Sequence, residues 1–229
     1  MRGVVAALLL TATVPLAAQR PSMPTAHPDF SGYWELRMDS FSVPRAALTA
    51  QAAAGVEAQT KRDTDALSRC TPIGMPALMD DRSTLDIRHA PTVLAMVAKS
   101  PSSTRYIYTD GRNHPPADEL EPTTNGHSIG RWEGETLVVD TVAFNTRGVT
   151  RIPGGGYRTG TSRLVERYRL LDDGQRLSVI FTWDDPSVFQ QPHAYEFRYY
   201  RARNVSEPRV LNCVANAERT RFLNSDPGR

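Results

Sequence analysis

The stretch that decides the fold runs from residue 163 to residue 202 and reads RLVERYRLLDDGQRLSVIFTWDDPSVFQQPHAYEFRYYRA. Apolar and polar residues alternate along it, a period of two that is typical of β-strands with one buried face. We expect three strands here, at Arg163–Leu171, Gln175–Trp183 and His193–Ala202. Asp173-Gly174 occupies the short gap between the first two strands, where it favours a tight hairpin.

The same alternation extends towards the N-terminus. Six further strands are expected, at Phe30–Met38, Thr84–Arg88, Thr92–Ala98, Thr104–Thr109, Ser128–Trp132 and Thr136–Val142. Ala46–Leu67, rich in Ala and Gln, is the one expected helix. Successive strands joined by short turns predict a mainly β fold, in which an antiparallel meander closes into a barrel or forms a curled sheet.

The N-terminal residues indicate export. Arg2 precedes a short apolar run at 3–16, and Leu16-Ala17-Ala18-Gln19 offers small residues for cleavage. We therefore expect a signal peptide at 1–19, a single domain at 20–229 that begins with a mobile tether, and a periplasmic or extracellular location. No later segment approaches the ~20 apolar residues of a transmembrane helix.

Charge and cysteine content narrow the classes further. The formal net charge of +2 falls to +1 without Arg2, which argues against electrostatic capture of nucleic acid. In an oxidising compartment, Cys70 and Cys213 are expected to form a disulfide, with two free thiols as the alternative. Neither cysteine belongs to a C-x-x-C pair, so a metal site built on them is not favoured.

Period-two positions define an expected interior. On the three strands that decide the fold, the inward set is Leu164, Glu166, Tyr168, Leu170, Leu177, Val179, Phe181, Trp183, His193, Tyr195, Phe197 and Tyr199. Asp140 and His89 are assigned to the same interior. A buried carboxylate must be paired or protonated, so Glu166 is either a catalytic group or half of a structural ion pair, for example with Arg131.

The connection from Gly111 to Gly126 carries the candidate chemistry. His114 and His127 lie at its two ends, which approach each other if the flanking strands are neighbours. One imidazole can then act as a general base, although a turn-capping role for His127 is an alternative. No zinc-binding motif is present, and catalytic zinc usually needs three protein ligands, so neither a metal nor another cofactor is predicted.

Arginine and aromatic residues complete the expected site. Arg112 and Arg131 are predicted to clamp an anionic or carbonyl-bearing ligand, and Asp140 is the expected acidic partner of the histidines. The alternative is an Arg131–Asp140 ion pair that only holds a hairpin. Further ligand contacts are expected from Tyr106, Tyr108, Trp132, Trp183, His193 and Tyr195.

Two segments, YTDGRNHPP at 108–116 and NGHSIGRWEGETLVVDTV at 125–142, resemble a widespread family of secreted bacterial proteins that share a GHSIGRWEGDTLVVDT-like phrase. The resemblance covers about Phe30 to Asn216 and implies no activity. Glu135 departs from the Asp that the family often has. The opening Gly32-x-Trp34 is similar to that of lipocalin-type barrels, which implies a barrel that holds a small apolar ligand.

Two functions follow from these expectations. The first is the binding of a small hydrophobic or aromatic molecule outside the cytoplasm. The alternative is a cofactor-free hydratase, isomerase or cyclase that uses His127, His114, Asp140 and Glu166 for acid–base chemistry. A pocket in which an imidazole and a carboxylate converge would favour the enzyme.

Overall fold

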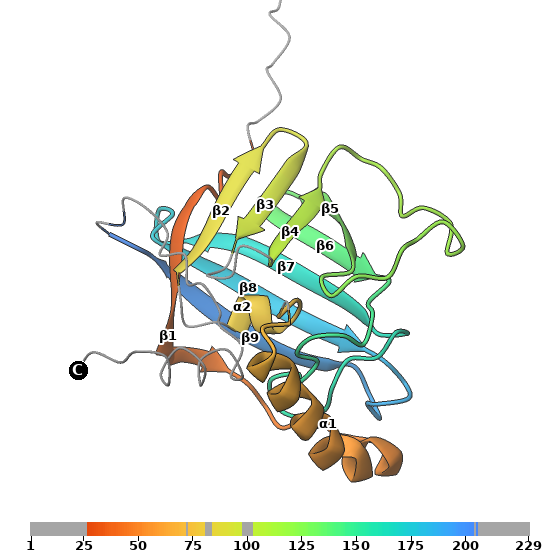
Figure 1. Cartoon of the computed structure of the whole chain (residues 1–229). Coiled ribbons are helices and arrows are strands. Elements are labelled where there is room, and N and C mark those ends of the chain that lie inside the picture. The colour runs from red at the N-terminus through yellow and green to blue at the C-terminus, as the bar shows by residue number, and fades with distance from the viewer. Residues whose placement is uncertain (1–26, 72, 81–83, 98–102, 204, 206–229) are drawn as a thin grey trace, which may run out of the picture.

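The computed structural model describes residues 27–71, 73–80, 84–97, 103–203 and 205. Their nine strands form a closed barrel in chain order (Figure 1), with bounds β1 Gly32–Ser42, β2 Thr84–Ala90, β3 Val93–Val97, β4 Thr104–Tyr108, β5 His127–Glu133, β6 Thr136–Val142, β7 Arg163–Leu171, β8 Arg176–Asp184 and β9 His193–Arg201. The predicted mainly β barrel is confirmed. The expected signal peptide and Cys213 lie outside the described residues.

The barrel closes where β9 pairs antiparallel with β1, as at Leu36 and Tyr199. All other neighbouring strands are antiparallel except β4 and β5, whose parallel pairing joins Ile107 to Ser128 and Tyr108 to Ile129. Parallel neighbours need a long connection, and residues 109–126 supply it as a loop that stands outside the barrel (Figure 1). The expectation of an antiparallel meander throughout is therefore wrong at this one seam.

Alternation places the side chains of β7 to β9 as predicted, and Glu166 is fully buried. On β6 the predicted faces are reversed, because Leu137, Val139 and Thr141 are the buried residues and Asp140 points outward. Both faces of β6 carry apolar residues, since Val138 and Val142 lie on its half-buried outer face. The apolar pattern alone therefore could not distinguish the two faces.

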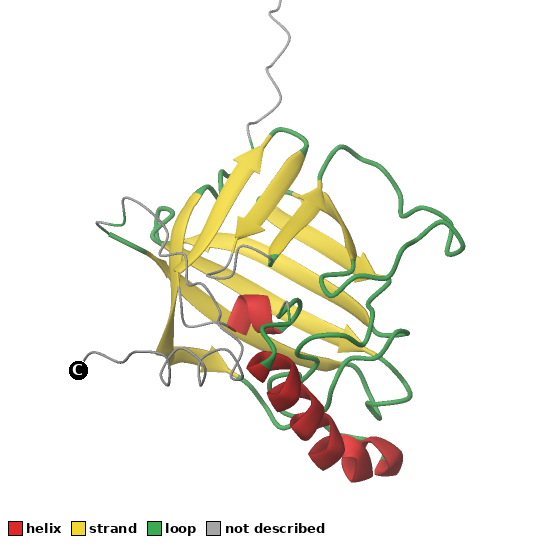
Figure 2. Ribbon diagram, viewed as in Figure 1, coloured by secondary structure: helices red, strands yellow, loops and turns green. Residues whose placement is uncertain are grey.

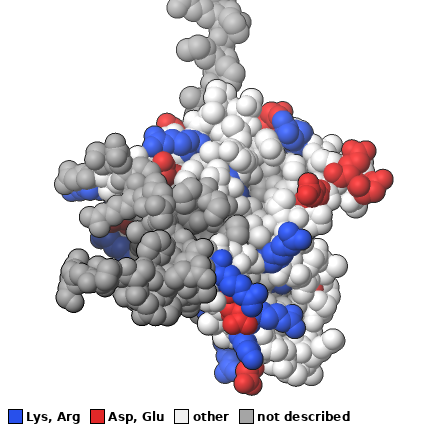
Figure 3. Space-filling model, viewed as in Figure 1, with Lys and Arg blue, Asp and Glu red and all other residues white. Residues whose placement is uncertain are grey.

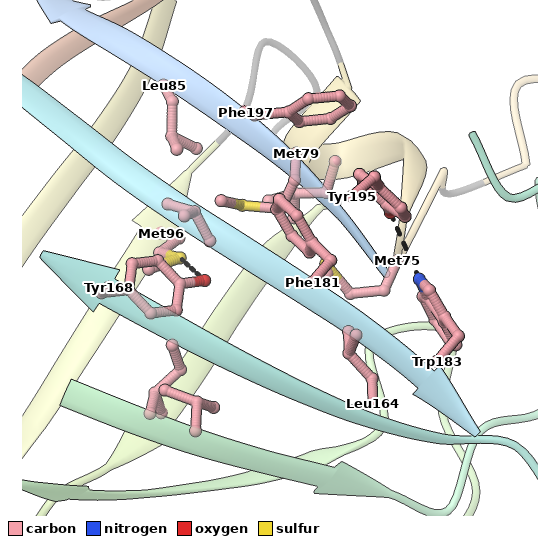
Figure 4. Packing of buried hydrophobic residues seen from close by; sticks show 14 of the residues in the cluster. Met75, Met79, Leu85, Met96, Leu164, Tyr168, Phe181, Trp183, Tyr195 and Phe197 are labelled. Carbon is pink, nitrogen blue, oxygen red and sulfur yellow. Dashed lines mark hydrogen bonds between the residues drawn. The ribbon is translucent and has the colours of Figure 1, made fainter. Parts of the chain in front are cut away.

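Side chains fill the described interior of the barrel. The short helix α2 (Ala77–Asp80) lies at one mouth of the barrel (Figure 2), and Met75 and Met79 reach in beside Phe181, Tyr195 and Phe197 (Figure 4). The Tyr199 hydroxyl donates a 2.6 Å hydrogen bond to the Met79 carbonyl, which fixes α2 in this position. The sequence predicted no helix here, because four residues are too few to show a helical period.

Helix α1 (Ala50–Ser68) lies outside the barrel (Figure 2). It begins four residues later than predicted, because Thr49 caps it by accepting a hydrogen bond from the Ala52 N–H. The buried Asp63 carboxylate accepts hydrogen bonds from the backbone N–H groups of Thr150 and Arg151, which ties α1 to the connection between β6 and β7. No helix among the described residues is long and apolar enough to cross a membrane.

Candidate functional site

The two histidines at the ends of the 109–126 loop meet on the outer face of the barrel. His114 lies on the loop and His127 is the first residue of β5, and their Nδ1 atoms are 2.7 Å apart. The rings stand edge to face with centroids 4.9 Å apart. The two ends of the loop lie close together because the loop connects the paired strands β4 and β5, as the sequence suggested. The meeting point, however, is outside the barrel and not within it.

Asp140 is the acidic group nearest to this pair. Its Oδ2 atom lies 3.6 Å from His114 Nε2, which is an ion-pair distance and slightly too long for a hydrogen bond. Arg163 on β7 donates two 2.7 Å hydrogen bonds to the same carboxylate. Asp140 is therefore held between a guanidinium and an imidazole on the outer surface. The sequence reasoning did not identify Arg163, because an exposed arginine on a strand carries no distinguishing pattern.

This arrangement favours one set of proton positions. The 2.7 Å contact requires a hydrogen on one of the two Nδ1 atoms. Because Asp140 faces His114 Nε2, a hydrogen is best placed there, and a neutral His114 then accepts at Nδ1 from His127. His127 Nε2 is left with its lone pair. The row Asp140–His114–His127 thus ends in a basic nitrogen.

The surroundings keep both rings neutral. Burial lowers the pKa of His114, and the nearby Asp140 carboxylate opposes that effect only in part. Burial also lowers the pKa of His127, and the neighbouring His114 and the Arg112 guanidinium lower it further. With both pKa values below the ordinary value of about 6.5, the neutral, proton-accepting form predominates at pH 7.

His127 borders a groove of about 420 Å³ between β4 and the loop. The groove is hollowed beside the β4–β5 seam, where pairing between the strands is shortest. Its walls combine aromatic, amide and carboxylate side chains, and its lining includes Tyr106, Tyr108, Pro115, Glu119, Leu120, Glu121, Asn125 and His127. Tyr106 is 54% exposed and Tyr108 stacks on His127 with ring centroids 5.6 Å apart. Both tyrosines face outward, at the groove and not inside the barrel.

The two arginines expected to clamp a ligand are occupied by other partners. Arg131 donates to the carbonyl of Arg112 at 3.2 Å and to Asn113 Oδ1 at 2.7 Å, so it holds the loop. Arg112 forms an ion pair with Asp110, and its guanidinium lies 4.1 Å from the centre of the Tyr108 ring. The Arg131–Asp140 ion pair considered from the sequence does not form, because Asp140 pairs with Arg163 instead.

Glu166 is separate from this site. It pairs inside the barrel with Arg105, whose Nη1 atom donates to Glu166 Oε1 at 2.8 Å, and it accepts a 2.7 Å hydrogen bond from the Tyr168 hydroxyl. The Arg105 guanidinium also reaches Ser128 and Thr141. The suggested partner Arg131 was wrong. Arg105 was recognisable, since it shares a face of its strand with the apolar Ile107.

The remaining predicted contact residues lie away from the groove. Trp183 and Tyr195 are buried in the barrel and hydrogen-bonded to each other at 3.2 Å. His193 Nε2 lies 2.7 Å from the Pro153 carbonyl, and Trp132 stacks on Phe30 with ring centroids 5.6 Å apart. All four are engaged in packing or in hydrogen bonds within the protein.

Within the described ranges, no three His, Cys, Asp or Glu side chains gather in a way that would hold a metal ion. Comparison of the sequence with models of known protein families finds no match. A search of curated proteins finds no significantly similar sequence. The resemblance to secreted proteins with the GHSIGRWEG phrase therefore stays a prediction, and the geometry of the groove is the main guide to function.

Proposed function

We propose that the protein binds a small molecule in the groove between β4 and the 109–126 loop and acts on it by general acid–base catalysis, without a cofactor. The observation that carries the proposal is the contact between His114 and His127, with Asp140 beside His114 and His127 in the lining of the groove. Hydratases, isomerases and cyclases are the reaction classes that need only such proton transfers.

In this mechanism, His127 Nε2 takes a proton either from the substrate or from a water molecule that attacks the substrate. The contact between the two Nδ1 atoms fixes the tautomer and the ring orientation of His127, and Asp140 in turn orients His114. Arg163 holds the Asp140 carboxylate in position through two hydrogen bonds. The proton then returns from Nε2 to another atom of the substrate, so the cycle leaves the protein unchanged.

Simple binding without chemistry is the second candidate, and it uses the same groove. It is favoured by Tyr106, an exposed aromatic side chain of the kind that commonly contacts ligands. An apolar ligand within the barrel is less well supported, because α2 and the aromatic core occupy the described interior. The apolar segment at 1–19 supports our proposal that the protein works in the periplasm or outside the cell.

Incubation of the purified protein with a small-molecule extract, followed by mass spectrometry, tests the proposal. We expect the wild type to convert one compound into a product of equal mass, or of a mass changed by one water. His127→Asn should abolish the conversion. Ser178→Ala, on β8 and therefore four strands away from β4 in the barrel, should not affect it. Conversion that is equally fast in the His127 variant would contradict the proposal.

A further inference from the structure

We infer that the ligand of the groove is a small organic cation, an amine or guanidine attached to an apolar ring or chain. This inference rests on the proposed function for the location of the ligand, and it names the chemical class. It reverses the expectation from the sequence, in which Arg112 and Arg131 were to bind an anion. Three features of the groove support it.

The first feature is a lining rich in hydrogen-bond acceptors. Glu119 and Glu121 both line the groove and are exposed. Acidic side chains gather at the outer end of the loop, towards the right of the view (Figure 3). Asn125 also lines the groove, and its Nδ2 atom donates to the Thr104 carbonyl at 3.0 Å. The exposed carboxylates of Glu119 and Glu121 are acceptors that a ligand in the groove can reach, and they favour a ligand that donates hydrogen bonds.

The second feature is that the nearby arginine side chains are held by other groups of the protein. Arg105 lines the groove at its floor, but its side chain is 1% exposed and pairs with Glu166. Arg112 pairs with Asp110, and Arg131 is bound to the loop. The groove therefore presents uncompensated negative charge, which favours a cationic ligand over an anionic one.

The third feature is the aromatic wall on β4. Tyr106 and Tyr108 lie two residues apart and face the same side of the strand. The ring of Tyr108 already carries the Arg112 guanidinium at 4.1 Å, so this wall accommodates a cation–π contact. Tyr106 has no such partner among the described residues and is the most exposed of the large apolar side chains described. A ligand cation placed on Tyr106 would lie in the groove that His127 borders.

Binding of three matched probes tests the inference. Phenethylamine, phenethyl alcohol and phenylacetate share a ring and differ in charge, and isothermal calorimetry on the full-length protein compares them at neutral pH. We expect the amine to bind at least about tenfold more tightly than the other two. Its affinity should fall as salt is added, because the carboxylates are exposed.

Variants then locate the site. Tyr106→Ala and the double variant Glu119→Gln/Glu121→Gln should each weaken amine binding by about tenfold or more. Tyr33→Ala and Glu133→Gln change an aromatic and an acidic side chain elsewhere on the surface, and they should leave binding unchanged. The five substituted residues are exposed or, for Tyr33, half-buried, so melting curves are expected to confirm that each of the four variants is folded.

Equal binding of the three probes, preferred binding of phenylacetate, or an unaffected Tyr106 variant would overturn the inference. These results are distinguishable from failure of the proposed function. Loss of the amine preference with a hydrogen-bonded His114–His127 pair refutes only the ligand class. An amine preference without that histidine pair supports the ligand class and contradicts the catalytic role.

Discussion

At the scale of single residues, the direction of each side chain on β5 and β6, more than its chemical type, decides whether the residue belongs to the groove or to the barrel interior. His127 and Ser128 are adjacent, yet His127 reaches the outer groove and Ser128 joins the buried Arg105 cluster. The histidine pair was predictable, because both residues flank one loop. The position of Asp140 was not, because the apolar residues on either side of β6 gave no preferred face.

The lowered pKa values of His114 and His127 make a prediction about stability at acidic pH. A pKa that is lower in the folded than in the unfolded state means that the unfolded chain binds more protons as the pH falls below about 6.5. The free energy of unfolding should therefore be largest above that pH and decrease as the pH falls towards the folded pKa values. Urea denaturation at a series of pH values measures this.

The double variant His114→Gln/His127→Gln is the control for that experiment. It should lose the part of the decrease in stability that His114 and His127 cause, while His89, whose pKa is also lowered by burial, retains its own part. If the double variant and the wild type show the same pH dependence, the two histidines titrate as exposed residues and our description of the site is wrong.

At the scale of elements, the loop at 109–126 and the seam beneath it decide where the site lies. The strands β7, β8 and β9 were predictable from alternation, whereas the parallel β4–β5 pairing was not, because an eighteen-residue connection permits either direction. Helix α2 was not predicted, because its four residues are too few to show a helical period. The seam is short, so the loop depends on its own contacts to stay against the barrel.

Arg131 provides several of those contacts, and its removal should release the loop. Arg131→Ala removes the hydrogen bonds to Arg112 and Asn113, so we expect faster hydrogen exchange and faster proteolysis within residues 110–122. The fold should remain, since Arg131 is exposed. Arg167→Ala, which breaks an exposed ion pair with Glu133, is the matched control. Equal exchange in both variants would show that Arg131 does not hold the loop.

At the scale of the whole molecule, a buried ion pair links two strands of the barrel wall, β4 and β7, that are not direct neighbours. Arg105 on β4 reaches Glu166 on β7 and contacts Ser128 and Thr141 on the two strands between them. Burial on its own would lower the pKa of Arg105, but the Glu166 carboxylate outweighs that effect, so the pKa of Arg105 is raised. The pair therefore holds together the side of the barrel that carries the groove.

Glu166→Gln should destabilise the protein by about 3–5 kcal/mol, because it leaves the Arg105 charge buried without its partner. The double variant Arg105→Met/Glu166→Leu removes both charges and should recover much of that loss. Chemical denaturation measures both effects. If the destabilisation of the double variant equals the sum of those of the single variants Arg105→Met and Glu166→Leu, the two side chains are not coupled.

The expected disulfide between Cys70 and Cys213 would join the segment after α1 to the C-terminal region, but Cys213 lies outside the described residues. Thiol titration of the exported protein, unfolded without reductant, should detect almost no free thiol. Two titratable thiols per chain would rule out the disulfide.

¹⁵N NMR of the imidazole nitrogens shows whether Asp140, His114 and His127 act as one acid–base unit. At a pH of about 7.5, we predict that His127 carries its proton on Nδ1 and His114 on Nε2, and that His114→Ala shifts the pKa of His127 upwards towards its ordinary value. If His127 instead carries its proton on Nε2 and titrates near its ordinary value with or without His114, the account is contradicted.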